Sequence, residues 1–501
     1  MRSALVRLVR LVCVVAGVGS LAACSTTVHV PLQAQVALPA AFKNVPLTSL
    51  RLSRSLQAPP GWWHELQDPV LNGWIDVALT RNRDLVRSAL RLQQASLMAG
   101  RAELDAWPKV SGNLGASAQQ SLSPALRSAA GVLTGRSAPG QSNPDTPAGR
   151  LSTGATGGLS SSYEVDLWGR VSQNTALAQQ DAAIARADLL AARWLLTTQV
   201  AEQYWTLAAM DAKAPLMARA IEDARANLAA TQLKLTVGKA RLADEHQALA
   251  ALSDAQQRLQ ALGLQRDNAL RIMALLLDEA PQDFKFTQAS LPEQLPPEPA
   301  DWPVASVLDR IPAVQRARIA LDQSLTKLKI AQSNRYPQLS LSASLNGSGS
   351  QWRQLLSNPL GSLGLGLALP MFDWKRLGVE QDSARLGLEV AAVDFRDALF
   401  KALAEVDSQY NQRLQWQAEA QLQQEKTSHA QSALAVAQLR HAQGAEPLQA
   451  VRDAQGKLRE LQLFALDTRL KAWLNQVAIH KAWGGPLEGL GAAPAPSATL
   501  K

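Results

Sequence analysis

The chain is poor in cysteine: Cys13 and Cys24 are the only two among 501 residues. Both lie near the N-terminus, so the body of the protein can contain neither a disulfide framework nor a cysteine nucleophile or CxxC metal site. The six histidines are scattered, and HxxxH, GxSxG and Walker patterns are missing. We therefore expect no enzyme activity, no catalytic or metal-binding residues and no cofactor.

The chain also lacks clustered charge and long apolar runs. Its net charge of +8 is spread along the sequence without a block of Lys and Arg, so nucleic acid is not an expected partner. After the N-terminal segment, no apolar run approaches the ~18 residues that a membrane-spanning helix requires. The sequence therefore predicts that any membrane-spanning part consists of β-strands, because only helices and closed barrels satisfy their backbone hydrogen bonds in lipid.

The N-terminal segment has the composition of an export signal. Three arginines accompany the apolar run Leu11–Leu21, which is too short to cross a bilayer as a helix. The residues Leu21–Cys24 resemble a bacterial lipobox, in which the cysteine becomes the lipidated first residue of the mature chain. Ser25 then resembles the residue found in lipoproteins that are sent to the outer membrane. We expect a cleaved signal peptide, residues 1–23, and a covalent lipid on Cys24; the alternative is an ordinary signal peptide that contains a cysteine.

The two halves of the chain resemble each other, which indicates an internal repeat. The matching segments are Trp107–Ser111 with Tyr336–Ser340, Asp166–Arg170 with Asp373–Arg376, and Leu235–Ala240 with Arg440–Ala445. The first half carries an insertion, Gln119–Ala155, that is rich in Ser, Pro and Gly. We expect this insertion to be a long extracellular loop between two strands; the alternative is a disordered interdomain linker.

Each half predicts the same order of elements. A helix comes first, over Gly73–Ala106 and Val304–Arg335, and an aromatic-Pro pair stops it. Alternating residues then predict a half-buried strand. They are Val110, Gly112, Leu114 and Ala116 in the first half, and Leu339, Leu341, Ala343 and Leu345 in the second. After a loop, a second strand returns near Gly154–Val165 and Gly361–Met371, and a long helix follows.

The long helices are expected over Val171–Val237 and Gly378–Gln443. Apolar residues repeat at intervals of seven, as in Val379, Leu386, Val393 and Phe400, which is typical of a coiled-coil seam. Pro215 is expected to kink or restart the first long helix. At Gly238 and Gly444 the chain turns, and a second helix runs back to complete a hairpin. Taken alone, the heptads favour a plain periplasmic coiled coil without membrane-spanning strands, and it is the paired strands that argue against this alternative.

Four amphipathic strands are too few to close a barrel, for which about eight is the practical minimum. An open sheet in lipid would leave the hydrogen-bonding groups of its edges unsatisfied, so several chains must pool their strands. Six aromatic residues flank the strand ends, and we expect an aromatic girdle at the membrane interface or, alternatively, packing where helix meets strand. They are Trp107, Tyr163, Trp168, Tyr336, Phe372 and Trp374.

Taken together, these segments resemble the TolC-like outer-membrane efflux proteins, in particular the NodT-type lipoprotein branch. The resemblance covers nearly all of the chain after Gln57 and depends on the order and spacing of several short motifs. They are Trp62-Trp63 with Asp68-Pro69 and Leu71, Ala78-Leu79, Asn82–Leu85, Tyr163–Arg170, Pro312–Val314, Leu369–Asp373, Asp453–Gln455 and Ala482–Gly485.

The resemblance implies a homotrimer with a twelve-stranded transmembrane β-barrel and a periplasmic α-helical barrel, anchored by lipid in the bacterial outer membrane. This passive exit duct would conduct small molecules such as drugs from a periplasmic adaptor and an inner-membrane RND-type pump. The expected segments are a signal peptide (1–23), a lipidated tether (24–60), a first repeat (61–280), an equatorial linker (281–303), a second repeat (304–485) and a flexible tail (486–501).

Relatives close their tunnel at the helix tips, which correspond here to the turns at Gly238 and Gly444. Asp453 matches a family aspartate that rings the constriction, and Asp244 matches a tip aspartate of the other hairpin. Gln449 stands where others place an apolar plug, and Arg452 and Glu446 are nearby charges. Three copies of Asp453 would form a negative collar that attracts cations. The alternative for each is a solvated charge on a helix face.

Two other interpretations of the function are compatible with parts of the sequence. A type I protein-secretion duct would share the same fold, although the lipobox favours small-molecule efflux. A periplasmic adaptor would contain one helical hairpin between other modules, whereas this chain repeats a hairpin preceded by a strand pair. The exported substrate is left open, because selectivity in such systems is expected to lie largely in the pump.

Overall fold

The computed structural model describes residues 61–120, 151–286, 290–294, 308, 310–349 and 359–484. The expected signal peptide, Cys24, the tether and the tail 486–501 lie outside these ranges, as do most of the insertion and most of the linker. Among the described residues, no helix combines the length and the apolar character needed to cross a membrane.

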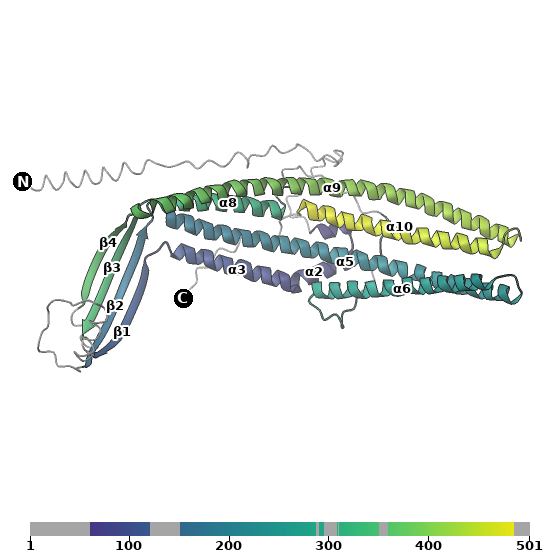
Figure 1. Cartoon of the computed structure of the whole chain (residues 1–501), viewed down its shortest axis with the longest axis horizontal. Coiled ribbons are helices and arrows are strands. Elements are labelled where there is room, and N and C mark those ends of the chain that lie inside the picture. Colours follow the sequence, from purple (N-terminus) through teal and green to yellow (C-terminus); the bar gives the residue numbers. More distant parts are fainter. Residues whose placement is uncertain are drawn as a thin grey trace, which may run out of the picture. The chain divides into compact units, whose positions relative to one another are not determined.

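Four strands form one antiparallel sheet in the order β1-β2-β3-β4 (Figure 1). Their bounds are Lys109–Gln120 for β1, Leu151–Val165 for β2, Gln338–Gly349 for β3 and Leu360–Ala368 for β4. The two expected strand pairs are therefore present, and β2 joins them by pairing with β3. Large apolar residues of the sheet are uncovered, since Leu114 is 80% exposed and Leu363 89%, so the expected half-burial does not occur at these positions within one chain.

Two strand boundaries differ from the expectation. β1 and β2 extend into both ends of the insertion, whose residues Gln119 and Ala155 are paired with strand partners, so only 121–150 can connect the strands. β4 ends at Ala368 rather than Met371, because Pro370 has no backbone N–H for the ladder, and Met371 begins the short 3-10 helix η6 (Met371–Asp373).

The first expected helix is wrong as a single element, since α2 (Pro69–Arg81) and α3 (Arg83–Leu104) are separated at Asn82. Asn82 has an extended backbone, and its Oδ1 accepts hydrogen bonds from the backbone N–H groups of Asp84 (2.9 Å) and Leu85 (3.1 Å). Its Nδ2 donates to the carbonyl oxygen of Leu276 at 2.9 Å. An asparagine that caps the next helix and bonds to a distant one ends the helix before it.

The long helices agree closely with the expectation. α5 spans Arg170–Thr236 and continues through Pro215 without restarting, and α9 spans Trp374–Ala442, beginning before Gly378. Each is followed by a return helix, α6 (Leu242–Leu276) or α10 (Leu448–Trp483). In the second half, α8 (Pro312–Ser333) precedes β3 and begins at a proline, which suits the first position of a helix.

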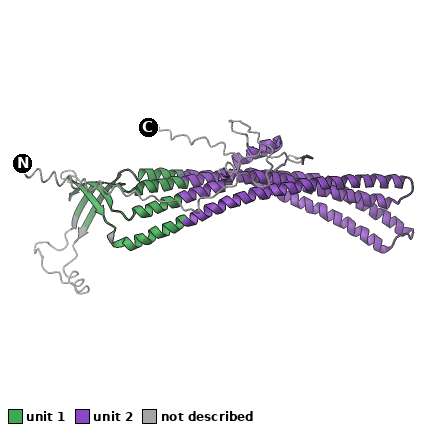
Figure 2. Ribbon diagram, turned by 90° about the horizontal axis from the view of Figure 1, so that it is seen from above, with its two compact units in different colours: residues 1–30, 96–181, 323–388 green, residues 31–95, 182–322, 389–501 purple. Residues whose placement is uncertain are grey.

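The chain divides into two compact units that do not follow the repeat (Figure 2). Unit 1 contains the four strands with the adjoining ends of α3, α5, α8 and α9. Unit 2 contains the rest of these helices, the 3-10 helix η4 (Trp62–Leu66), α2, α6 and α10. Each unit thus combines segments from both halves of the sequence.

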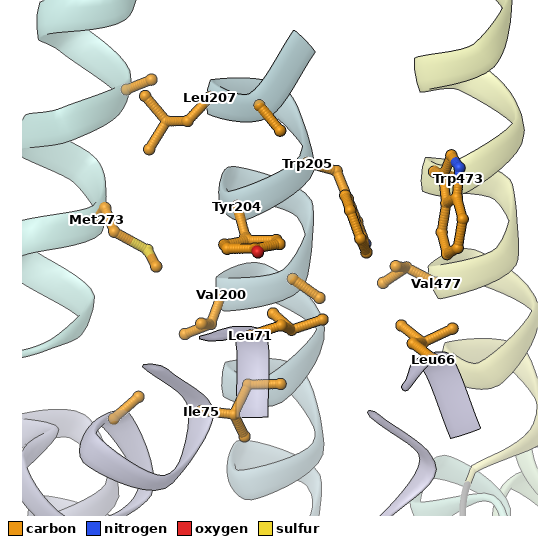
Figure 3. Packing of buried hydrophobic residues seen from close by; sticks show 14 of the residues in the cluster. Leu66, Leu71, Ile75, Val200, Tyr204, Trp205, Leu207, Met273, Trp473 and Val477 are labelled. Carbon is orange, nitrogen blue, oxygen red and sulfur yellow. The ribbon is translucent and has the colours of Figure 1, made fainter. Parts of the chain in front are cut away.

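The core of unit 2 is rich in large side chains. Trp205 and Tyr204 of α5, Met273 of α6 and Trp473 of α10 are buried together with Leu71 of α2 (Figure 3). The rings of Trp205 and Trp473 lie 4.5 Å apart between centroids. Each such side chain contributes about 1.5–3 kcal/mol when it leaves water, so this cluster fixes both hairpins to the N-terminal helices.

Candidate functional site

The tip of the first hairpin is built around Gly238. Its φ of +69° lies in the left-handed region that glycine adopts readily, and its N–H donates to the carbonyl of Leu235 at 3.0 Å. Three residues later Arg241 occupies the N-cap position of α6, where the Asp244 carboxylate accepts a hydrogen bond from the Arg241 backbone N–H at 2.8 Å. Asp244 therefore has a structural role as a helix cap, while its side chain stays on the exposed surface of the tip.

The tip of the second hairpin repeats this construction at Gly444, whose φ is +73°. The backbone N–H of Ala445 reaches back to the carbonyl of Arg440 at 2.8 Å. Glu446 then accepts the Arg440 guanidinium at 3.0 Å, and its carbonyl lies 2.9 Å from Nδ1 of His441. Glu446 is thus bound to the end of α9 and closes the turn.

Asp453 is exposed one helical turn beyond Gln449, whose Nε2 donates to Oδ1 of Asp453 at 2.9 Å. Arg452 is half-buried beside it, and the preceding Val451 is buried against the hairpin. Of the five expected gate residues, the structure therefore joins only Gln449 to Asp453 directly. Glu446 closes the same turn, and Asp244 belongs to the other hairpin.

Ion pairs between the hairpins are a feature that sequence reasoning missed. Lys213 and Asp223 on α5 pair with Asp467 and Arg459 on α10. Within the first hairpin, Arg266 of α6 donates to Asp211 of α5 at 2.6 Å, and this hydrogen bond raises the pKa of the Arg266 guanidinium. No local pattern signals these pairs, because the partners are far apart in the sequence.

A second polar cluster holds the connection from β2 to α5. The Asp166 carboxylate accepts hydrogen bonds from the backbone N–H groups of Val171 (2.9 Å) and Ser172 (2.8 Å), so it caps α5. Partial burial raises the pKa of Asp166, but the bonds from Ser172 and Val171 outweigh it and the pKa is lowered. Arg170 donates through Nε to Glu164 at 2.9 Å.

The six expected girdle aromatics fall into different environments. Trp168 stacks on Tyr336 with centroids 4.6 Å apart and donates from Nε1 to the Pro337 carbonyl at 2.8 Å. Arg335 lies 3.9 Å above the Trp374 ring. Packing where helix meets strand therefore describes Trp168, Tyr336 and Trp374.

The other three aromatics differ in their exposure. Trp107 is 69% exposed, Phe372 is fully exposed, and Tyr163 on β2 is half-buried. These side chains are available to a surrounding membrane interface, and the girdle stays a prediction.

The repeated strand pair and long helical hairpin define a class of protein before any relative is considered: a helical hairpin protein with an incomplete β-sheet. The family model for outer membrane efflux protein matches residues 74–277 and 304–485. The chain therefore belongs to the outer membrane efflux protein family, as its sequence motifs predicted, and it is an outer-membrane component of an efflux system. Members of this family are transport ducts, and the periplasmic-adaptor alternative is wrong.

Curated relatives cover most of the chain. The pyoverdine export outer membrane protein OpmQ of Pseudomonas aeruginosa is 25% identical over 404 residues, covering 79% of this chain and 81% of that protein. The probable efflux pump outer membrane protein TtgC of Pseudomonas putida is 25% identical over 441 residues, covering 85% of each.

Solved structures share the fold. The open state of the MtrE outer membrane channel of Neisseria gonorrhoeae has a TM-score of 0.77 at 22% identity, covering 92% of this chain and 98% of that one. The outer-membrane channel OprN has a TM-score of 0.75 at 20% identity over the same shares.

Proposed function

We propose that three copies of this chain form one passive duct, with their strands pooled in the outer membrane and their helical hairpins enclosing a periplasmic tunnel. The observation that supports this proposal most strongly is that the four-stranded sheet is open. Among the described residues, β1 and β4 each pair with only one strand, and leucine side chains of the sheet are exposed. Unpaired edges are not tolerated in lipid, and four strands cannot close on themselves. A cyclic assembly pairs β4 of one copy with β1 of the next.

The duct would carry small molecules that a periplasmic adaptor and an inner-membrane RND-type pump deliver. Relatives named for pyoverdine export and for toluene efflux support small-molecule cargo. In this proposal the chain has no energy source of its own, so the pump supplies the energy for transport.

The proposed gate lies at the helix tips, where Asp453 would form a three-membered negative collar. The exposure of Asp453 near the Gly444 turn supports this role, since an exposed carboxylate can face its symmetry mates. The hydrogen bond from Gln449 would hold each carboxylate in position. Like charges brought together repel one another, so the collar must be restrained by the packing of the hairpins.

Conductance of the full-length protein in planar bilayers tests this proposal. We expect small or intermittent currents for the wild type and larger currents for Asp453→Ala, because the variant removes the collar. Asp254→Ala is the matched control, since Asp254 is also an exposed aspartate on a hairpin helix but lies about three helical turns into α6 from the tip. The absence of conductance in all three proteins would contradict a duct, and equal effects of both variants would contradict the gate.

A further inference from the structure

The register of the sheet assigns each strand residue to one of two faces. Directly paired residues of antiparallel strands lie on the same face, and successive residues alternate between faces. Val110, Ser161, Ala343 and Leu363 are paired in series across the sheet, and so are Ser111, Ser160, Ser344 and Ser362. The four strands thus carry two continuous faces of different chemistry.

The first face, which we call the leucine face, is apolar along most of its area. Its large members include Leu114, Leu159, Leu341, Leu345, Leu363 and Leu365. All six are among the exposed large hydrophobic side chains of the chain. An apolar surface of this size needs a nonaqueous neighbour, and the outer membrane that this family occupies supplies acyl chains.

The second face, which we call the hydroxyl face, is polar but uncharged over its middle. It consists only of Ser, Thr, Asn and Gly within residues 111–117, 156–162, 340–348 and 362–366. Serine, threonine and asparagine side chains each offer both a donor and an acceptor, and hydroxyl groups rotate to present either one. The face can therefore solvate a cation, an anion or a neutral polar group.

Because of its glycines, the side chains of this face do not project far from the sheet. A Cβ at Gly364 would lie 2.8 Å from the Ser342 Oγ, and one at Gly366 would lie 2.6 Å from the Ser340 Oγ. The hydroxyls thus occupy the space that a side chain on the opposing strand would fill. Elsewhere hydroxyls bond to each other, as Ser344 does with Ser362 at 2.8 Å. Short side chains that lie along the sheet leave the space in front of it open.

Charge appears on this face only at its helix-side end, among the described residues. Lys109 and Glu164 are the two charged side chains, and both are paired: Lys109 lies 2.9 Å from Asp105, and Glu164 binds Arg170. At the other end of the sheet, Leu360 is the one large apolar residue on the hydroxyl face. Each charge on this face is balanced by a partner of opposite sign, so the described residues of the face add no net charge.

We propose that the hydroxyl face lines the duct where it crosses the outer membrane, and that this stretch passes cargo according to size without selecting for the sign of its charge. The inference rests on the proposed assembly of strands from several copies into one barrel. The leucine face then meets lipid. Any preference for cations arises at the Asp453 collar, where like carboxylates gather, rather than in the barrel.

Adjacent cysteine substitutions on opposite faces test this assignment. Ser342→Cys lies on the hydroxyl face and Leu341→Cys on the leucine face of the same strand. Both are placed in the full-length protein carrying Asp453→Ala, and the parent without an added cysteine is the control. Each duct is measured in planar bilayers under a KCl gradient, before and after a cationic or an anionic methanethiosulfonate reagent.

We expect the unmodified Asp453→Ala duct to have a K⁺ to Cl⁻ permeability ratio near one. Modification of Ser342→Cys should lower conductance, and the two reagents should shift the reversal potential in opposite directions. Leu341→Cys should not change, because charged reagents do not enter the acyl region. Modification of Leu341→Cys alone would overturn the face assignment, and strong ion selectivity before modification would overturn charge indifference. A conducting duct that fails these tests leaves the proposed function standing, whereas a lack of conductance in the parent contradicts that function.

Discussion

Arg459 on α10 forms an ion pair with Asp223 on α5, although the two residues are 236 positions apart in the sequence. The Arg459 side chain is only 15% exposed, while that of Asp223 is 43% exposed. Burial and the nearby positive charge of Arg219 lower the pKa of Arg459. A charged group in such a position needs its partner, so this pair and the neighbouring Lys213–Asp467 pair hold the second hairpin against the first.

Loss of the Arg459 partner should therefore destabilise the protein. For Asp223→Asn we expect a loss of about 1 kcal/mol, because solvent around Asp223 screens part of the interaction. Glu460→Gln is the control: its pair with Lys457 lies on the same helix, but both side chains are mostly exposed. Thermal unfolding of the detergent-solubilised protein measures the difference. An equal effect of both substitutions would show that the pair between the hairpins contributes no more to stability than an exposed pair on one helix.

The break between α2 and α3 gives a second prediction. Asn82→Ala removes the cap of α3 and the hydrogen bond to the Leu276 carbonyl, and leaves that carbonyl without this donor. We expect a loss of about 2 kcal/mol, the sum of a helix cap and a buried hydrogen bond. Asn174→Ala should change stability far less, because Asn174 is exposed and bonds only within α5. Comparable melting temperatures for the two variants would rule out a structural role for Asn82.

His480 predicts a pH dependence of stability. Its ring is 5% exposed, stacks on Trp62 at 4.9 Å and lies 3.2 Å from the Gln476 amide, and burial together with the charge of Arg413 lowers its pKa to about 4. Glu65 also faces it at 3.9 Å. In the unfolded chain this histidine binds a proton near its ordinary pKa of 6.5, whereas in the folded chain it stays neutral until about pH 4. Stability should thus be full above pH 6.5 and fall as the pH drops from 6.5 to 4.

The size of this loss is up to about 3 kcal/mol, from the separation of the two pKa values. Chemical unfolding at several pH values measures it. His480→Gln removes the titrating group while keeping a polar side chain beside Gln476, so its stability should depend less on pH across this window. An unchanged pH slope in the variant would assign the dependence to other groups.

Lipidation of Cys24 remains a prediction from the lipobox, since this residue lies outside the described structure. Metabolic labelling with palmitate in the host cell should mark the wild type and Cys13→Ala, but not Cys24→Ala. Cys13 is the natural control because it is the other cysteine of the chain and lies within the expected signal peptide. Persistent labelling of Cys24→Ala would place the lipid elsewhere.

Much of the architecture was determined locally by the sequence. The strand alternation around Val110 and Leu339, the glycine turns at Gly238 and Gly444 and the length of α5 each follow from short-range rules: the period of two, the left-handed conformation of glycine and the heptad spacing. Because the same rules apply in both halves, the repeat is visible without coordinates. The family follows from the order of these motifs.

Only the tertiary structure decided which distant groups meet. The end of α2 at Asn82 depends on a carbonyl of α6. The hairpins are held together by ion pairs such as Arg459–Asp223. His480 stays neutral because it is buried against Trp62. Such contacts follow no period, because the partners are brought together by the packing of whole helices. The hydroxyl face depends on both levels. Alternation along each strand places its residues on one side of that strand, and the register of three strand pairs aligns them into one continuous face.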